Sequence, residues 1–74
     1  SAVDTYDDGD LTRCILKLPH DYREVLLLKY DLGFSNKEIA DALDISQDLV
    51  RKRLQRARNA LQHICKMEGI NDIF

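Results

Sequence analysis

The sequence predicts an all-α fold, a small four-helix domain formed by a single chain of 74 residues. Three observations support this prediction. Apolar residues recur at intervals of three and four along most of the chain, which is the period of an amphipathic helix. Capping signals, one proline and a few glycines divide this pattern into short segments. Apolar residues make up 45% of the chain, which is enough for one modest core but not for an enzyme-sized pocket.

The first two helices are predicted from a cap, a proline and a glycine. A short helix is expected from residue 10, with Asp10 as its cap, and Pro19 should end it. Its buried face is expected to hold Leu11, Cys14, Ile15 and Leu18. A second helix should begin near residues 20–22 and end at about residue 32, because Gly33 can supply a left-handed stop. The residues expected on its buried side are Tyr22, Val25, Leu26 and Tyr30.

The third helix carries a stronger start signal. Residues 35–38 match the capping box Ser-x-x-Glu, in which the serine and glutamate side chains each bond to the other residue's backbone. Phe34, just before the cap, is placed to pack on Ile39 as a hydrophobic staple. A helix is therefore expected over residues 36–43.

The fourth helix is predicted to be long. After a three-residue turn, Ser46 is expected to cap a helix over residues 47–66, with Ile45 placed to pack on Val50 and Asp48 favourable in the first turn. About 20 residues make a rod of roughly 30 Å. The stripe expected to be buried consists of Val50, Leu54, Ala57, Leu61 and Ile64.

Charge is divided unevenly along the chain. Residues 51–66 hold six basic and no acidic residues, whereas residues 4–48 hold eleven acidic residues against five basic ones. The net charge of -2 conceals this division, and a phosphate backbone responds to the local field rather than to the total. The open surface of the fourth helix carries Arg51, Lys52, Gln55, Arg56 and Asn59.

The third helix, the turn and the long basic helix together outline a helix-turn-helix. We expect it on a three-helical core like that of homeodomains or winged-helix domains, without a wing. The small residue Ala40 allows the two helices to cross closely, so that the N-terminal end of the long helix can enter the major groove. Basic side chains would then contact phosphates, and outward residues of the first two turns would contact base edges. The pattern therefore predicts DNA binding.

Composition argues against several other classes. The longest apolar run, residues 25–28, is too short to cross a membrane, and the acidic N-terminus does not resemble a signal peptide, so a cytoplasmic domain without a membrane partner is expected. Cys14 and Cys65 lack zinc-site spacing and are expected to be buried, reduced thiols, although a disulfide between them stays open. His20 and His63 are isolated and are expected at the surface or at a cap. We expect no metal, no cofactor and no catalysis, because no nucleophile and base, carboxylate pair or phosphate loop stands at workable spacing.

An ordered set of motifs runs through about residues 11–61. It consists of Leu18-Pro19, Arg23-Glu24-Val25-Leu26, Leu28-Lys29-Tyr30, Gly33-Phe34-Ser35, Lys37-Glu38-Ile39-Ala40, Leu43, Ile45-Ser46 and Val50-Arg51-Lys52-Arg53-Leu54-Gln55-Arg56-Ala57-Arg58. This combination resembles region 4 of bacterial sigma factors of the sigma-70 family, and most closely the extracytoplasmic-function group. The resemblance implies a domain over residues 10–66 that recognises the promoter minus-35 element and docks on the flap of the RNA polymerase β subunit. Residues 1–9 would be a flexible acidic tail or a linker remnant, and residues 67–74 a C-terminal tail.

The resemblance also assigns roles to individual residues. The expected DNA-binding residues are Lys37, Gln47, Arg51, Lys52, Gln55 and Arg56. Leu27 and Leu32 are the candidates for receiving an apolar helix of the polymerase flap. For Arg53 and Arg58, at the edge of the buried stripe, an ion pair with an acid such as Glu38 competes with a DNA role. The isolated domain is expected to be a monomer, and an anti-sigma partner is left open.

Four residues depart from the family pattern, and one of them is Lys52, which replaces a common serine and adds a charge. Asp44 stands where the family often has glycine, Asp48 where a small residue is common, and Leu49 where threonine is frequent. Asp48 would repel phosphate close to a duplex unless it accepts from a cytosine amino group. The bases that are read therefore stay open.

Three alternatives also stay open: a stand-alone helix-turn-helix regulator, a response-regulator output domain, and a sigma-like protein-interaction module without DNA binding. Binding to the polymerase β flap would distinguish a sigma factor from the first two alternatives, because neither of them has a general need to bind the flap. Reversing the charges of Arg51 and Arg56 would separate the third, since only a DNA reader would lose affinity for a promoter.

Overall fold

The computed structural model describes residues 8–69, and within that range it consists of helices and short connections without a strand. The elements are α1 (Asp8–Leu16), α2 (His20–Leu26), the π-helical turn η2 (Leu27–Asp31), α3 (Asn36–Leu43) and α4 (Gln47–Met67). This confirms the predicted all-α class. The predicted tails, residues 1–9 and 67–74, lie mostly outside the described residues. In the described part of the chain, no helix is both long and apolar enough to span a lipid bilayer.

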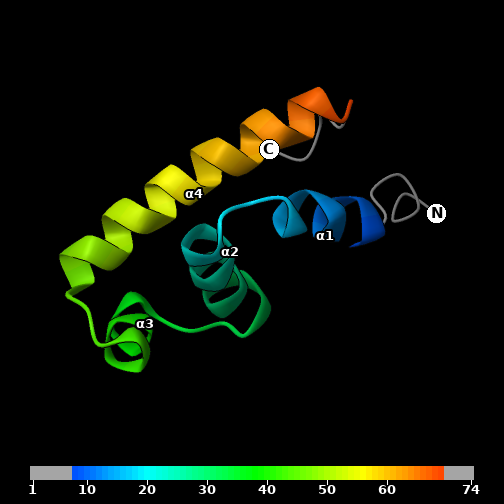
Figure 1. Cartoon of the computed structure of the whole chain (residues 1–74). Coiled ribbons are helices and arrows are strands. Elements are labelled where there is room, and N and C mark those ends of the chain that lie inside the picture. Colours follow the sequence, from blue (N-terminus) through cyan, green and yellow to red (C-terminus); the bar gives the residue numbers. More distant parts are fainter. Residues whose placement is uncertain (1–7, 70–74) are drawn as a thin grey trace.

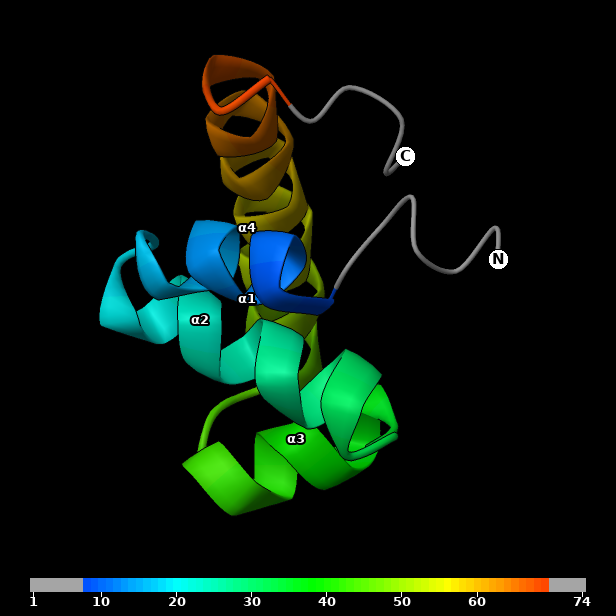
Figure 2. The ribbon, with the colours of Figure 1, turned by 90° about the vertical axis from the view of Figure 1, so that its right-hand side faces the viewer.

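α4 is the long rod of the molecule, and α1, α2 and α3 all pack against it. Figure 1 shows these three helices on one side of α4, with α3 at its N-terminal end and α1 towards the other end. In the turned view of Figure 2, α1 and α2 cross the rod and α3 lies at its lower end. One long side of α4 therefore carries no other helix of residues 8–69.

The core lies where the shorter helices meet α4. Its buried residues are Cys14, Leu18, Val25, Leu26, Ile39, Ala40, Val50, Leu54, Ala57, Leu61 and Cys65. The predicted stripe of α4 is confirmed except at its last position, where Cys65 is buried and Ile64 is half-buried against the same cluster. Cys65 takes this place because it lies one helical turn beyond Leu61 and faces Cys14 of α1.

α1 begins two residues earlier than predicted. Asp10 is therefore inside the helix and is not its cap, because capping signals locate a helix start only to within a residue or two. The predicted face is confirmed, with Cys14 and Leu18 buried and two further residues, Leu11 and Ile15, packed half-buried against the core. Pro19 separates α1 from α2 and is the N-cap of α2.

α2 does not continue as an α-helix to residue 32 as predicted. It passes into η2, which is closed by a hydrogen bond from the Leu32 N–H to the Leu27 carbonyl oxygen at 3.0 Å. A π-turn holds an extra residue, so the side chains that follow leave the register of 3.6 residues per turn. This explains why the prediction was wrong for Tyr30, which is 61% exposed, while Leu28 packs half-buried against the core. Gly33 ends the segment at a φ of 74°, as predicted.

α3 has the predicted bounds and the predicted capping box. The Glu38 N–H donates to Ser35 Oγ at 3.1 Å, and the Ser35 N–H donates to Glu38 Oε1 at 2.9 Å. The hydrogen bond from the Ser35 backbone, followed by that from its hydroxyl, holds the pKa of Glu38 below its ordinary value. Phe34 lies half-buried against the core cluster that contains Ile39, as the staple prediction requires.

The turn between α3 and α4 depends on Asp44. Its φ of 57° and ψ of 49° are left-handed, and among residues 8–69 it is the one non-glycine with positive φ. Glycine adopts this conformation without a steric penalty, which gives a physical reason for the glycine that the resemblance implies at this position. The Leu49 N–H then donates to Ser46 Oγ at 3.0 Å, so α4 starts as predicted, and it ends one residue later than predicted.

Candidate nucleic-acid interface

The six residues predicted to bind DNA are all exposed. Lys37 stands in the first turn of α3, and the other five stand in the first ten residues of α4. At 100° per residue, the side of α4 that faces away from the buried stripe carries Lys52, Gln55 and Arg56, with Arg51 at its edge. This is the side that no other described helix covers (Figure 1).

The helix-turn-helix brings α3 and α4 together at one end of the molecule. Asn36 of α3 and Gln47, Asp48 and Arg51 of α4 line a shallow hollow of about 240 Å³. Lys29 Nζ donates to Asn36 Oδ1 at 3.1 Å, which ties the start of α3 to η2. The N-terminal ends of both helices of the motif therefore share one surface.

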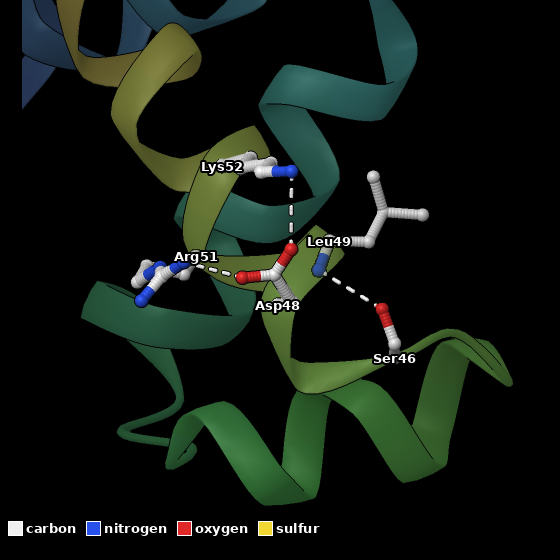
Figure 3. Close-up of polar contacts among 5 residues, drawn as sticks. All are labelled: Ser46, Asp48, Leu49, Arg51 and Lys52. Carbon is white, nitrogen blue, oxygen red and sulfur yellow. Dashed lines mark hydrogen bonds and ion pairs between the residues drawn. The ribbon is translucent and has the colours of Figure 1, made fainter.

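Asp48 lies between two of the predicted DNA contacts, as Figure 3 shows. Its Oδ1 pairs with the Arg51 guanidinium, and its Oδ2 pairs with Lys52 Nζ at 3.1 Å. The hydrogen bond and charge of Lys52, assisted by the charge of Arg51, hold the pKa of Asp48 below its ordinary value. From the sequence, Asp48 was expected to suit the first helical turn and to repel phosphate unless it accepts from a cytosine amino group, and no pairing with its neighbours was predicted. Its spacing of three and four from these bases could have predicted both ion pairs.

The remaining polar residues of α4 differ in how far they are engaged. Gln55 Nε2 donates to Asn59 Oδ1 at 3.3 Å, and Arg56 makes no ion pair or hydrogen bond with another residue of 8–69. Arg58 donates to the Tyr30 hydroxyl at 2.7 Å, and Arg53 makes no ion pair within the described range. Within residues 8–69 neither arginine makes the ion pair that competed with a DNA role in the sequence analysis. Glu38 is engaged in its capping box instead, and η2 presents Tyr30 to Arg58.

The two predicted polymerase-binding leucines are exposed, Leu27 by 40% and Leu32 by 61%. Leu27 lines two hollows of about 310 Å³ each. One of them runs along α1 and η2 and is also lined by Leu11, Thr12, Ile15, Leu26, Tyr30 and Asp31. Leu32 lines neither hollow. The structure thus separates the two leucines and places only Leu27 in an apolar concavity.

Two further groups of titratable residues lie away from this surface. His20, Asp21 and Glu24 have possible ligand atoms within 4.8 Å of one another, so His20 is less isolated than predicted. These groups lie at the start of α2, and we assign no metal to them.

Cys14 and Cys65 are buried free thiols, as predicted. Burial, followed by the hydrogen bond with Cys14, raises the pKa of Cys65 to about 11, so its thiol stays protonated at neutral pH.

The helix-turn-helix with a basic, uncovered helix defines the class of small helical nucleic-acid-binding domains. The family is given by a direct match, because residues 8–61 match the model of sigma-70, region 4. The chain belongs to the sigma-70 region 4 family, which confirms the resemblance found in the sequence.

Two known proteins are similar to part of the chain. Over 46 residues it is 46% identical to the probable RNA polymerase sigma factor RfaY of Xanthomonas campestris pv. campestris, a match that covers 62% of this chain and 12% of that protein. Over 48 residues it is 46% identical to the ECF RNA polymerase sigma factor SigW of Bacillus subtilis, a match that covers 65% of this chain and 26% of that protein. The matched region thus spans about a quarter of these relatives' length or less. No solved structure matches the chain significantly.

Proposed function

We propose that this chain is the promoter-reading domain of a sigma factor and binds duplex DNA at the minus-35 element during transcription initiation. The observation that carries this proposal is the group of exposed polar and basic side chains on the uncovered side of α4, at the N-terminal end braced by α3. The two similar proteins, which are named as RNA polymerase sigma factors, support the same function.

The chemistry of the side chains suggests which of them contact bases and which contact phosphates. Arg51 and Lys52 can donate to guanine O6 and N7 in the major groove, and Gln55 can pair with adenine. Lys37 and Arg56 suit phosphate contacts, which fix the orientation of the domain without reading sequence. Gln47 is the first residue of α4 and lines the same hollow as Asn36 at the start of α3. It is therefore placed to contact the DNA backbone where α4 would enter the groove.

Binding by the isolated domain should be weak and sensitive to salt. Roughly four or five phosphate contacts lie within reach of one small helix-turn-helix. Each of these contacts releases counterions from the DNA, so the affinity falls as the salt concentration rises. A second DNA-reading domain held on the same polymerase would make this contact intramolecular and raise the effective concentration. The function therefore belongs to the complex with polymerase more than to the free domain.

Charge reversal tests the DNA-binding proposal. Arg56→Glu should lower the affinity for duplex DNA by about tenfold or more at 0.1 M salt, because it replaces a phosphate-attracting charge with a repelling one. Lys66→Glu is the matched control, since Lys66 is also an exposed base of α4, and its side chain makes no ion pair with residues 8–69, but it lies near the other end of the helix. Fluorescence anisotropy with a labelled duplex measures both. Equal effects of the two substitutions would favour the alternative of an interaction module that does not bind DNA.

We also propose that Leu27 receives an apolar helix from the polymerase β flap, because it lines the hollow along α1 and η2. Leu27→Asp should abolish saturable binding to a purified β-flap fragment in calorimetry, with folding unchanged. Leu16→Asp serves as the control, because Leu16 is 61% exposed and lines neither hollow. Full binding by Leu27→Asp would remove this part of the proposal. Absence of flap binding by the folded parent chain would favour a stand-alone regulator or a response-regulator output domain.

Under this proposal the chain acts in the cytoplasm as a monomer and has no catalytic role or cofactor of its own. Its partners are promoter DNA and the polymerase core. An anti-sigma protein that covered the outer side of α4 would compete with DNA for the same charges.

A further inference from the structure

We propose that Asp48 is a specificity-determining residue of the DNA-binding surface. Its carboxylate holds Arg51 and Lys52 in the free protein and weakens binding to every duplex that does not offer those two bases better acceptors. This inference rests on the proposed function and deepens it.

The geometry gives one carboxylate two basic partners on the open side of a single helix. The side chains of Asp48, Arg51 and Lys52 are 55%, 69% and 57% exposed, and all three belong to the first two turns of α4 (Figure 3). Ion pairs this exposed are weak and exchange readily, so a duplex can replace them. The N-terminal end of α4 also carries a partial positive charge, which keeps a carboxylate favourable there when the bases turn to DNA.

The carboxylate changes non-specific and specific binding differently. With Asp48 present, the three side chains together carry one positive charge instead of two, so every duplex attracts this end of α4 less strongly. A phosphate or an acceptor-poor base edge gives Arg51 and Lys52 little beyond what Asp48 already provides. A guanine edge accepts from both donors of Arg51, and a cytosine amino group can donate to Asp48 itself.

The penalty is therefore the same for all sequences, while the compensation depends on sequence. An element that disfavours wrong partners in this way raises specificity without raising affinity.

The test compares Asp48→Asn with the parent chain on two probes. One probe is a labelled short duplex of mixed sequence, and the other is a duplex that the parent chain enriches from a randomised pool. Asp48→Asn should bind the mixed duplex about three- to tenfold more tightly at 0.1 M salt, with a steeper salt dependence, because one repelling charge is gone. Its affinity for the enriched duplex should change less, so the ratio of the two affinities should fall by about threefold or more.

Asp21→Asn is the matched control. Asp21 is exposed and is the second residue of α2, just as Asp48 is the second residue of α4. The substitution therefore also removes one negative charge from the first turn of a helix. It should change both affinities by less than about twofold, since it lies outside the helix-turn-helix. Asp48→Glu should restore the behaviour of the parent chain, because it keeps the charge within reach of both bases. Thermal unfolding of each variant verifies that it is folded.

Three results would overturn the inference. First, Asp48→Asn could change the two duplex affinities no more than Asp21→Asn does. Second, it could tighten binding to both duplexes equally. Third, Asp48→Glu could show the same duplex affinities as Asp48→Asn. Each of these leaves the proposed function standing as long as the parent chain binds DNA. If the folded parent chain binds neither duplex at any salt concentration, the proposed function itself is wrong.

Discussion

The two ends of α4 use the same charge arrangement for different purposes. Near its start, Asp48 pairs with Arg51 and Lys52 of the same helix. Just after its end, Glu68 pairs with Lys17, the residue that follows α1, and at 3.9 Å with Arg13 of α1. One acid thus contacts two bases at each end.

The origin of the basic partners makes the difference. At the C-terminal end they come from α1 and from the residue that follows it, so the ion pairs join distant parts of the chain and belong to the tertiary structure. The hydrogen bond from Lys17, with its charge, holds the pKa of Glu68 below its ordinary value. At the N-terminal end all three groups lie on one uncovered surface, so breaking the pairs disturbs no packing. A group of one acid and two bases can thus be part of the fold at one end of a helix and available to a ligand at the other.

The largest expected effect comes from the packing beneath the C-terminal end. Leu61→Ala should lower the free energy of unfolding by about 2–4 kcal/mol, because it removes a buried side chain and leaves a cavity. Gln62→Ala, one residue further and exposed, should change it by less than about 0.5 kcal/mol. Urea titrations followed by circular dichroism measure both. Similar stabilities of the two variants would contradict the assigned core.

The thiols at the same end give the second prediction. Cys14 and Cys65 should react with iodoacetamide at least about tenfold more slowly in the folded chain at pH 8 than in urea, because both are buried and the pKa of Cys65 is about 11. Mass spectrometry of quenched samples gives the rates. Rapid labelling of either cysteine under native conditions would show that α1 does not stay packed on α4.

The third prediction concerns the turn that leads into the N-terminal end. Asp44→Gly should raise the free energy of unfolding by up to about 1 kcal/mol, since glycine adopts the left-handed conformation without a steric penalty. Asp41→Gly, inside α3, should instead lower it by a few tenths of a kcal/mol. Thermal unfolding of both variants tests the opposite signs. A loss of stability in both would contradict the strain assigned to Asp44.

The smallest expected effect is the dependence of stability on pH. Glu38, Asp48 and Glu68 have pKa values lowered by folding, so the unfolded chain takes up protons first as pH falls. Their stabilising contribution should be complete above about pH 5 and should disappear as pH drops through the ordinary carboxyl range near 4 and below. Denaturant titrations from pH 7 to about pH 3 measure it, with Glu68→Gln and Asp48→Asn each expected to flatten the curve. Stability that increased with acidification would contradict the ion pairs.

The fold was predictable wherever the signals are local. The bounds of α3 and the start of α4 follow from serine caps and a capping box, whose partners lie three residues away in the sequence. The π-turn η2 has no comparable sequence signature, and its extra residue is why Tyr30 was wrongly assigned to the core and why its bond to Arg58 was not foreseen.

The candidate site was predictable to a similar extent. The exposure of the six residues predicted to bind DNA follows from helical periodicity and the family resemblance. The pairing of Asp48 with Arg51 and Lys52 could have been inferred from spacing. The contact between Cys14 and Cys65 could not, because it depends on how α1 docks on the far end of α4.

The most direct test of the difference between the two ends is amide chemical-shift mapping of the chain by NMR during titration with duplex DNA. We expect the largest shifts in residues 36–59, covering α3 and the first half of α4, and small shifts in α1 and in residues 60–69. Large shifts in α1 and at the C-terminal end, with little change near Arg51, would contradict the assignment of the N-terminal end as the DNA-binding surface.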